Sequence, residues 1–389
     1  MICIQHATIY TPDEVIEDGA ILVVDGRIQT IAPTSQIELP DRVSCFDATG
    51  LHLVPGFIDL QLNGAIGLDF TSEPRAIWPV AHYLPQTGVT SFLPTIITSP
   101  LTAVAAAQEI VTSSPPRGFQ GAIPLGLHVE GPFLHPDKKG AHNPVYLQLP
   151  TAEKVANWSL ESGIRLVTLA PELDGALDVV QLLSERGIIV SAGHSTANFA
   201  QATVGFDAGI RYGTHLFNAM PPLHHREPGL AGALLADNRT TIGLIVDGEH
   251  VHPELVNLVW RLVGNGRLTL VTDAMAALGM PSGRYVLGDY EVIVDETTAR
   301  LPSGTLAGSL LRMDTAVRNL INFTGCTLAE ALPTVTRTPA NLLGLSHKGR
   351  LAPNCDADLL LLTPDLQVHT TFIAGKIIYK KNLSTDYAD

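Results

Sequence analysis

Two histidines, His194 and His215, each follow a short run of β-branched residues and are separated by one helix-like segment. The β-branched runs cover residues 188–190 and 210–212, and the segment between them, residues 197–208, has a helical composition. Parallel α/β proteins place their sites at the carboxyl ends of such strands. Either histidine alone could be a packed structural residue, but two on successive strand ends predict a metal site, because imidazole is the commonest metal ligand.

Polar residues also end other apolar strands in the middle of the chain. They are Asp59, Gln61 and Asn63 at the first strand, His128 and Glu130 at the third, Asp247 and His250 at the seventh, and Asp273 at the eighth. One carboxylate and two imidazoles around an open position form a catalytic zinc arrangement. The metal lowers the pKa of its bound water to about 7. A carboxylate outside the ligand set must then accept the proton, and Asp273 is our candidate for this general base.

Each of these residues also has a structural interpretation. Glu130 precedes a Gly-Pro pair and could complete a turn, and Asp273 could cap a helix. His128 lies one pleat deeper than Glu130, so we expect it to pack behind the site rather than in it. The basic cluster at residues 224–226 fits either a solvated loop or an anion-binding loop.

The elements that must position these residues alternate regularly along the middle of the chain. Eight strand-like runs end near residues 61, 97, 130, 169, 192, 215, 247 and 273. Helices are expected over residues 75–86, 101–113, 152–162, 173–186, 197–208 and 253–263, with two more over 309–323 and 328–343. This count predicts a (β/α)8 barrel of the TIM type. A doubly wound sheet is the alternative, but its Gly-rich phosphate turn is missing after the first strand.

Both ends of the chain have the composition of β structure. Asp25-Gly26 is a hairpin signal in the first segment, and residues 359–362 and 371–379 are strand-like in the last one. Neither end alone buries enough apolar surface to be stable. We therefore expect residues 1–52 and 349–389 to form one small β-sandwich domain beside a barrel of residues 53–348.

Composition excludes several classes of protein. The chain has 389 residues, 46% of them hydrophobic, and a net charge of −14, so it is globular and does not bind nucleic acid through a basic surface. An anionic substrate would need a local positive pocket. The four cysteines form no CxxC pair, which is typical of a reducing compartment. No signal peptide and no bilayer-spanning run is present, so we expect a cytoplasmic protein without a membrane partner.

Nine motifs resemble the amidohydrolase superfamily and, within it, the N-acetylglucosamine-6-phosphate deacetylases. In the family's order they are PGFIDLQLNG at 55–64, HVEGPF at 128–133, KGAHNP at 139–144, GHS at 193–195, THLFNAM at 214–220, REPG at 226–229, DGEH at 247–250, VTDA at 271–274 and LAGS at 306–309. Each motif alone is weak evidence, whereas the whole set in this order is specific.

The resemblance implies a role for each matching residue. Glu130, His194 and His215 match the metal ligands, and Asp273 matches the general base that later protonates the departing amine. His142 matches the residue that contacts the sugar and helps to polarise the acetyl carbonyl.

The resemblance also implies how the substrate is held. Asn218 and Ala219 match contacts near the phosphate, Arg226 and His250 match its charged partners, and a neighbouring subunit completes the site. A homodimer, or a dimer of dimers, is therefore implied. The remaining implied substrate contacts are Ala141 and the covering loop of Leu306, Ala307 and Gly308.

The number of metals depends on the first strand. The superfamily usually carries His-x-His there, which holds a second metal, but this chain has Gln61 and Asn63. Neutral amides are poor ligands for transition metals. We therefore expect one divalent metal per subunit, with zinc as the first choice and Fe²⁺, Co²⁺ or Mn²⁺ as alternatives. Gln61, Asn63 and His128 stay candidates for a weak second metal or for supporting contacts.

The expected reaction is hydrolysis of N-acetylglucosamine-6-phosphate to acetate and glucosamine-6-phosphate by a metal-activated water. Alternative substrates are the N-acetylgalactosamine epimer, a cyclic amide and an N-acyl amino acid. A non-catalytic scaffold that has lost its metal is the alternative from another class, and the complete set of Glu130, His194, His215 and Asp273 argues against it.

Overall fold

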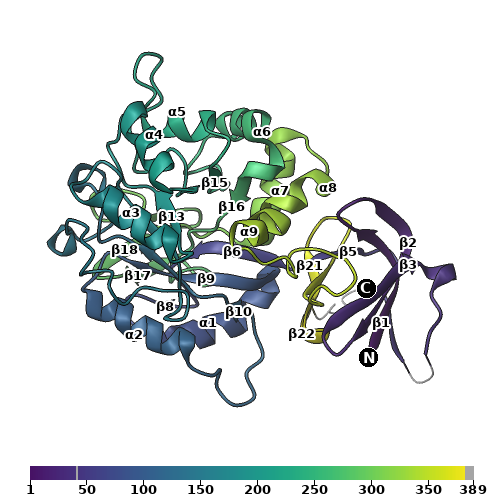
Figure 1. The fold of residues 1–389 in the computed structure, drawn as a ribbon. Coiled ribbons are helices and arrows are strands. Elements are labelled where there is room, and N and C mark those ends of the chain that lie inside the picture. The colour runs from purple at the N-terminus through teal and green to yellow at the C-terminus, as the bar shows by residue number, and fades with distance from the viewer. Residues whose placement is uncertain (41–42, 382–389) are drawn as a thin grey trace.

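The computed structural model describes residues 1–40 and 43–381, and a parallel barrel occupies their middle part (Figure 1). The strands that follow one another around it are β6 (Phe57–Leu62), β9 (Val89–Ile97), β11 (Leu127–Glu130), β12 (Ile164–Leu169), β13 (Ile189–Ala192), β14 (Tyr212–Gly213), β15 (Thr241–Leu244) and β16 (Leu268–Leu270). The short β10 (Ile123–Pro124) also pairs with β9. A parallel bridge between Leu62 and Ala274 joins the first strand to the end of the last one. The predicted (β/α)8 barrel is confirmed.

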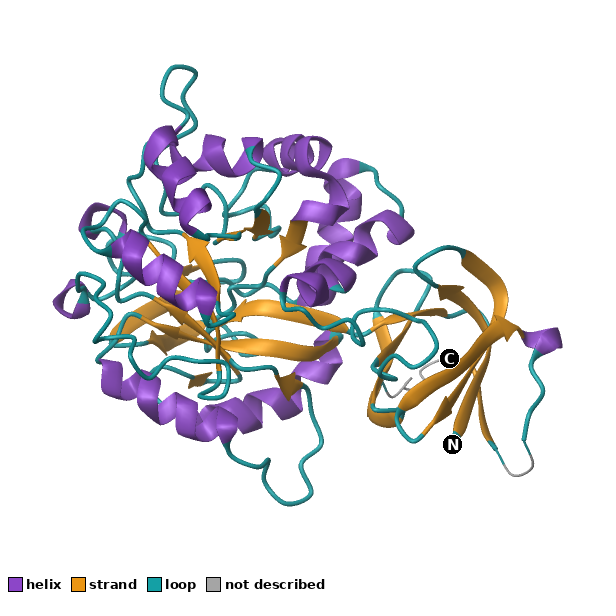
Figure 2. Cartoon of the chain, viewed as in Figure 1, coloured by secondary structure: helices purple, strands orange, loops and turns teal. Residues whose placement is uncertain are grey.

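Helices cover the outside of the barrel (Figure 2). They are α1 (Ile77–Tyr83), α2 (Leu101–Thr112), α3 (Ala176–Glu185), α4 (Phe199–Ala208), α5 (Gly229–Ala236), α6 (Pro253–Arg267), α7 (Met313–Thr324), α8 (Leu328–Ala331) and α9 (Arg337–Leu342). In the described part of the chain, no helix is long and apolar enough to span a bilayer.

The prediction of a helix over residues 152–162 was wrong, because this stretch forms turns. Its backbone hydrogen bonds close over three residues instead of four, as from the N–H of Trp158 to the carbonyl oxygen of Val155 at 3.0 Å, and a side chain from another element binds the same carbonyls. The guanidinium of Arg186 donates to the carbonyl oxygens of Val155 at 2.7 Å and Trp158 at 2.9 Å. Helix α5 was not predicted from the sequence. Its residues are nearly all apolar and buried, so the helix shows no amphipathic period.

The two ends of the chain build one sheet. Its order is β22 (Lys376–Lys380), β21 (Val368–Ile373), β20 (Leu359–Leu362), β5 (His52–Pro55), β1 (Ile2–Tyr10), β2 (Val15–Val24) and β3 (Arg27–Pro33), with β4 (Ser44–Asp47) also paired to β1. The antiparallel pair of β20 and β5 joins the C-terminal strands to the N-terminal ones. Ile4, Ile21, Leu361 and Phe372 are fully buried in the core of this sheet.

The domain boundaries stay a proposal. Residues 1–52 and 349–389 supply most of the terminal sheet, but β5 continues past residue 52 to Pro55. The last eight residues of the second segment lie outside the described residues.

A small antiparallel sheet, which the sequence analysis did not anticipate, follows the eighth barrel strand. It contains β17 (Gly283–Leu287), β18 (Tyr290–Val294) and β19 (Ala299–Arg300), and the two-residue strands β7 (Gly64–Ala65) and β8 (Leu68–Asp69) form a separate pair. Leu287 and Val292 of this sheet pack in one apolar cluster with Ala141 and Ala307. The small sheet therefore lies beside the carboxyl ends of the barrel strands.

Candidate metal centre

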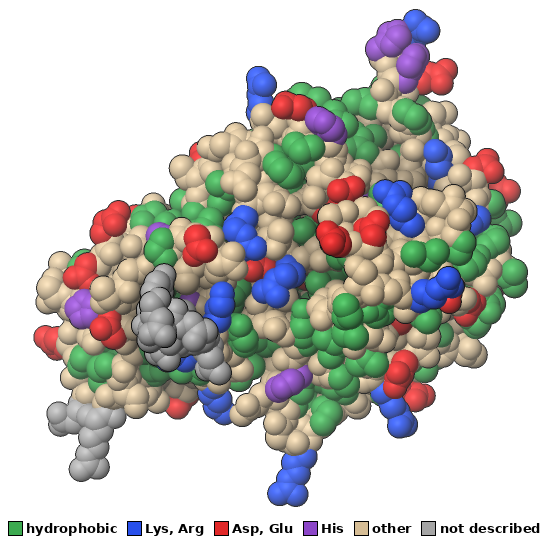
Figure 3. All heavy atoms as spheres, turned by 180° about the vertical axis from the view of Figure 1, so that it is seen from behind, with side chains coloured by type: hydrophobic (Ala, Val, Ile, Leu, Met, Phe, Trp, Pro, Cys, Tyr) green, Lys and Arg blue, Asp and Glu red, His purple; other side chains and the backbone are tan. Residues whose placement is uncertain are grey.

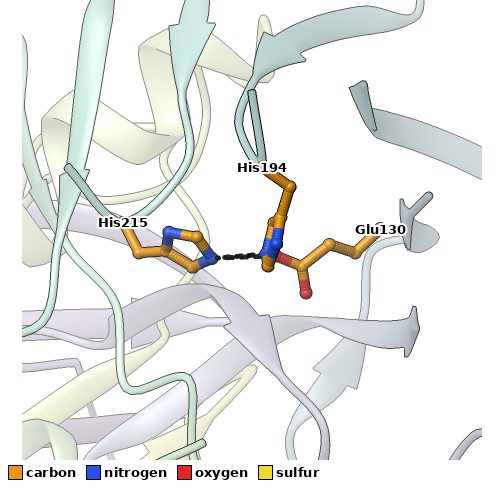
Figure 4. A group of neighbouring side chains, drawn as sticks. All are labelled: Glu130, His194 and His215. Carbon is orange, nitrogen blue, oxygen red and sulfur yellow. Dashed lines mark hydrogen bonds and ion pairs between the residues drawn. The ribbon is translucent and has the colours of Figure 1, made fainter. Parts of the chain in front are cut away.

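Three ligand-type side chains meet at the carboxyl ends of β11, β13 and β14 (Figure 4). Nε2 of His194 lies 3.1 Å from Nε2 of His215 and 3.2 Å from Oε1 of Glu130, and the third edge of the triangle is 3.1 Å. All three side chains are buried. Ligands about 2.0–2.1 Å from a tetrahedral zinc stand about 3.3–3.4 Å apart. The three atoms therefore form one face of a site that fits a small divalent cation.

One ring nitrogen of His194 is fixed by the main chain. Its Nδ1 lies 2.8 Å from the carbonyl oxygen of Lys138, which can only accept a hydrogen bond. Nδ1 therefore carries the proton, and Nε2 presents its lone pair to the other two ligands. Carbonyl oxygens orient metal-binding histidines in this way in many proteins.

Three site residues have strained backbone conformations. The φ angles of His194, His215 and Asp273 are 49°, 29° and 47°, in the left-handed region that residues with a Cβ rarely adopt. Such conformations cost of order 1–3 kcal/mol each and cluster at functional sites. All three follow barrel strands, so the strain accompanies the turn that brings each side chain to the mouth of the barrel.

The carboxylates of the site have opposite pKa shifts. Burial alone would raise the pKa of Glu130, but hydrogen bonds and charges from His194 and His215 hold it below its ordinary value. Burial and the negative charge of Glu130 raise the pKa of Asp273 to about 6. One carboxylate is thus kept ionised among the ligands, while the other has the proton affinity expected of a general base.

The amides of the first strand contact these carboxylates. Nε2 of Gln61 donates to Glu130 at 3.0 Å and to Asp273 at 3.2 Å, and Nδ2 of Asn63 donates to Asp273 at 2.7 Å. Both amides therefore act as hydrogen-bond donors that hold the carboxylates in place. His128 lies deeper, with Nε2 2.7 Å from the hydroxyl of Thr168, and burial lowers its pKa to about 4.

His142 has one ring nitrogen fixed by a residue that sequence reasoning missed. The backbone N–H of Thr98, just after β9, donates to Nδ1 of His142 at 3.2 Å, and the hydroxyl of Thr98 lies 2.8 Å from the same atom. A neutral His142 therefore carries its proton on Nε2, which lies 4.0 Å from Oε2 of Glu130. Burial, followed by the charge of His194, lowers the pKa of His142 to about 3, so it is a neutral donor at pH 7.

Glu172 is a second residue that was missed. It follows β12, and its carboxylate accepts from the hydroxyl of Ser195 at 2.7 Å and from the backbone N–H of Thr196 at 2.5 Å. These contacts hold the loop that begins at His194. The sequence did contain a signal for Glu172, namely an acidic residue three positions after the end of a barrel strand.

A cavity of about 490 Å³ opens over the triangle. The predicted site residues that line it are Asn63, Glu130, Ala141, His142, His194, His215, Asn218, Ala219, His250, Asp273, Leu306 and Gly308. Gln61, His128 and Ala307 are buried behind this wall. Lys138 and Arg300 also line the cavity and were not predicted.

The part of the cavity wall formed by Asn218, Ala219 and His250 has features of an anion site. Phe217 and Ala219 have φ angles of 75° and 53° within one turn, a conformation that can leave backbone N–H groups for an anion, while the N–H of Asn218 between them donates to the carbonyl oxygen of His215 at 3.0 Å. Nδ1 of His250 is 2.6 Å from the Asp247 carboxylate, which leaves Nε2 free to contact a ligand. Burial opposes ionisation of Asp247, but the hydrogen bond from His250 holds its pKa below the ordinary value.

Arg226 is the one predicted substrate contact on an exposed loop away from the cavity lining. Residues 221–228 project from the barrel before α5, with histidine, arginine and glutamate side chains near the tip (Figure 3). The guanidinium of Arg226 lies 2.9 Å from Nε2 of its neighbour His225. Within one chain, this loop does not bring its charge to the triangle.

Comparison with known proteins agrees with this geometry. The model of the amidohydrolase family matches residues 52–378. The chain is 40% identical over 351 residues to N-acetylglucosamine-6-phosphate deacetylase of Bos taurus, covering 86% of this chain and 85% of the relative. It is 38% identical to N-acetylgalactosamine-6-phosphate deacetylase of Escherichia coli O157:H7, over 93% of this chain and 95% of the relative. The crystal structure of N-acetylglucosamine-6-phosphate deacetylase from Pasteurella multocida superimposes with a TM-score of 0.91 at 32% identity, covering 98% and 100% of the chains.

The triangle predicts the metal content of the purified protein. After dialysis we expect about one tightly held divalent ion per subunit, because three protein ligands and water complete one tetrahedral site. His194→Ala should lose the ion and the activity together, whereas His347→Ala, outside the site, should keep both. Elemental analysis of the dialysed proteins checks this. Two tightly held ions per subunit, one of them lost in Gln61→Ala, would contradict it.

Proposed function

The chain belongs to the amidohydrolase family, and we propose that it hydrolyses N-acetylglucosamine-6-phosphate to acetate and glucosamine-6-phosphate. The observation that carries this proposal is the buried triangle of Glu130, His194 and His215, which opens into a cavity together with Asp273. Relatives that match most of the chain are named for this activity.

Members of this family depend on a metal, and we propose zinc, with Fe²⁺, Co²⁺ or Mn²⁺ as alternatives. Two imidazoles and one carboxylate suit each of these ions. When bound, such a cation polarises a carbonyl oxygen and makes water acidic enough to supply hydroxide near pH 7. The proposed holders are Glu130, His194 and His215.

Two further side chains have proposed roles in the reaction. Asp273, held by the amides of Gln61 and Asn63, accepts the proton of the attacking water. His142 donates from Nε2 to the oxygen of the acetyl carbonyl, where negative charge develops. Asp273 then returns its proton to the nitrogen as the C–N bond breaks, so that water and amide become acetate and amine.

The phosphate group needs positive charge that most of this acidic protein does not supply. We propose that the turn at Asn218 and Ala219 and the ring of His250 hold it in one subunit. Leu306 and Gly308 line the same cavity with Ala307 buried between them, and we assign to this loop and to Ala141 the contacts with the sugar and the acetyl group.

Arg226 acts in our proposal on the neighbouring subunit. Its loop projects into solvent and does not line the cavity of its own chain. A homodimer, alone or paired into a dimer of dimers, would place this guanidinium at a partner's phosphate site. We also propose a cytoplasmic location, because Cys3, Cys45, Cys326 and Cys355 are all free thiols.

The N-acetylgalactosamine epimer is the second candidate substrate. The relative from Escherichia coli O157:H7 that carries this activity in its name is nearly as similar as the others. Acetate release from both phosphorylated sugars and from unphosphorylated N-acetylglucosamine, by the metal-reconstituted enzyme, tests the proposal. The proposed function fails if neither phosphorylated sugar is hydrolysed faster than the bare sugar.

Replacing the proposed base separates proton transfer from metal binding. Asp273→Asn should keep its metal and lose kcat by about 10²–10⁴, the usual contribution of a general base. Activity of the wild type should fall on acidification, because only ionised Asp273 accepts a proton. Burial raises this pKa to about 6 and a bound cation lowers it, so the fall should begin at or below about pH 6. Asp178→Asn on α3 is the control, and loss of metal in Asp273→Asn would make Asp273 a ligand.

The shared phosphate site predicts complementation between two impaired variants. Arg226→Ala should raise KM for the phosphorylated sugar by about tenfold or more, as expected for a lost charge-assisted hydrogen bond. Mixed with Asp273→Asn subunits, it should regain part of the activity, because one site in the heterodimer then has both groups intact. The measurement is kcat/KM before and after verified subunit exchange. No recovery would contradict a contribution in trans.

A further inference from the structure

Lys138 connects two parts of the site that are far apart in the sequence. It ends the 3₁₀ turn Pro136–Lys138 in the loop between β11 and β12. Its ammonium group donates to the carbonyl oxygen of Met220 at 3.0 Å. Its own carbonyl oxygen accepts from Nδ1 of His194 at 2.8 Å. One residue thus touches a proposed metal ligand through its backbone and the end of the Asn218–Met220 turn through its side chain.

The ammonium group of Lys138 has capacity for a ligand. A lysine has three N–H donors, and the bond to Met220 uses one of them. The side chain is half-buried and lines the same cavity as Asn218, Ala219 and His250. Because Met220 directly follows Ala219, the charge lies beside the turn that carries Asn218 and Ala219 into the cavity wall.

Arg300, the other permanent cation at the cavity, is less suited to binding a ligand. Among the described residues that line the cavity, Lys138 and Arg300 are the ones with a permanent positive charge. Arg300 is exposed, and its guanidinium already donates to the hydroxyl of Thr298 at 3.2 Å and to the carbonyl oxygen of Gly304 at 3.0 Å. Asp137 also lines the cavity, but its side chain is 82% exposed, so solvent screens its negative charge.

We propose that the ammonium group of Lys138 binds the phosphate of the substrate held in the same subunit, beside Asn218, Ala219 and His250. This inference rests on the proposed function for the identity of the ligand. It adds a contact in cis to the one that Arg226 is proposed to make in trans. It also gives the phosphate a fixed distance from the metal site, because the backbone of Lys138 holds His194 and its side chain holds the Ala219 turn.

Kinetics on two substrates test the inference in the metal-loaded enzyme. Lys138→Met removes the charge and keeps the backbone carbonyl that orients His194, so metal content should not fall. KM for N-acetylglucosamine-6-phosphate should rise about 10-fold to 100-fold, far more than KM for the bare sugar. Lys138→Arg should restore most of the loss. The matched control is Lys139→Met, since Lys139 is also half-buried but does not line the cavity.

Binding of inorganic phosphate, measured by calorimetry, makes the test independent of catalysis. Lys138→Met should weaken this binding about tenfold or more relative to the wild type and to Lys139→Met. Unchanged phosphate affinity, or an equal rise in KM for both sugars, would overturn the role of Lys138. If the wild type shows no preference for the phosphorylated sugar, the proposed function fails instead, and the phosphate titration still decides whether Lys138 binds the anion.

Discussion

The structure depends on one unfavourable arrangement, the burial of a carboxylate against two imidazole nitrogens. Glu130, His194 and His215 hold three electron-rich atoms within 3.1–3.2 Å of one another in the interior of the barrel mouth. Burying an ionised group without compensation is costly. A bound divalent cation would compensate this cost, and the side chains that would hold it are Glu130, His194 and His215.

The tautomer of each histidine at the mouth of the barrel is set by the hydrogen-bond partner of one of its ring nitrogens. The Lys138 carbonyl accepts from His194, while the Thr98 backbone N–H donates to His142. The two rings therefore have opposite tautomers, so that one presents a lone pair and the other an N–H. His250 follows the same rule, since a carboxylate fixes its Nδ1. Chemically identical residues thus obtain from their neighbours the tautomers that suit their proposed roles as ligand, donor and anion contact.

The sequence allowed the barrel and the triangle to be predicted because both leave local signals. Strand ends carry the polar residues, and alternation places Gln61 beside the site and His128 behind it. The prediction of a helix over residues 152–162 failed because this stretch forms three-residue turns, whose carbonyls also accept from Arg186, a residue that lies more than 20 positions away. Thr98 and Glu172 were missed for the same reason. Their importance comes from contacts with loops that follow neighbouring strands of the barrel, and such contacts have no period along the chain.

Backbone strain at the site is a feature that the local sequence does not reveal, although the identity of the site residues could be predicted from it. His194, His215 and Asp273 all adopt the left-handed conformation that favours glycine. Local propensity would put a glycine or asparagine at such positions, so the chain retains residues that its backbone disfavours. The surrounding barrel supplies the compensation, through buried strands and through contacts such as those of Glu172 on the loop after His194. The positions of the candidate ligands are therefore set by the closed barrel as a whole, and the local sequence contributes the side chains.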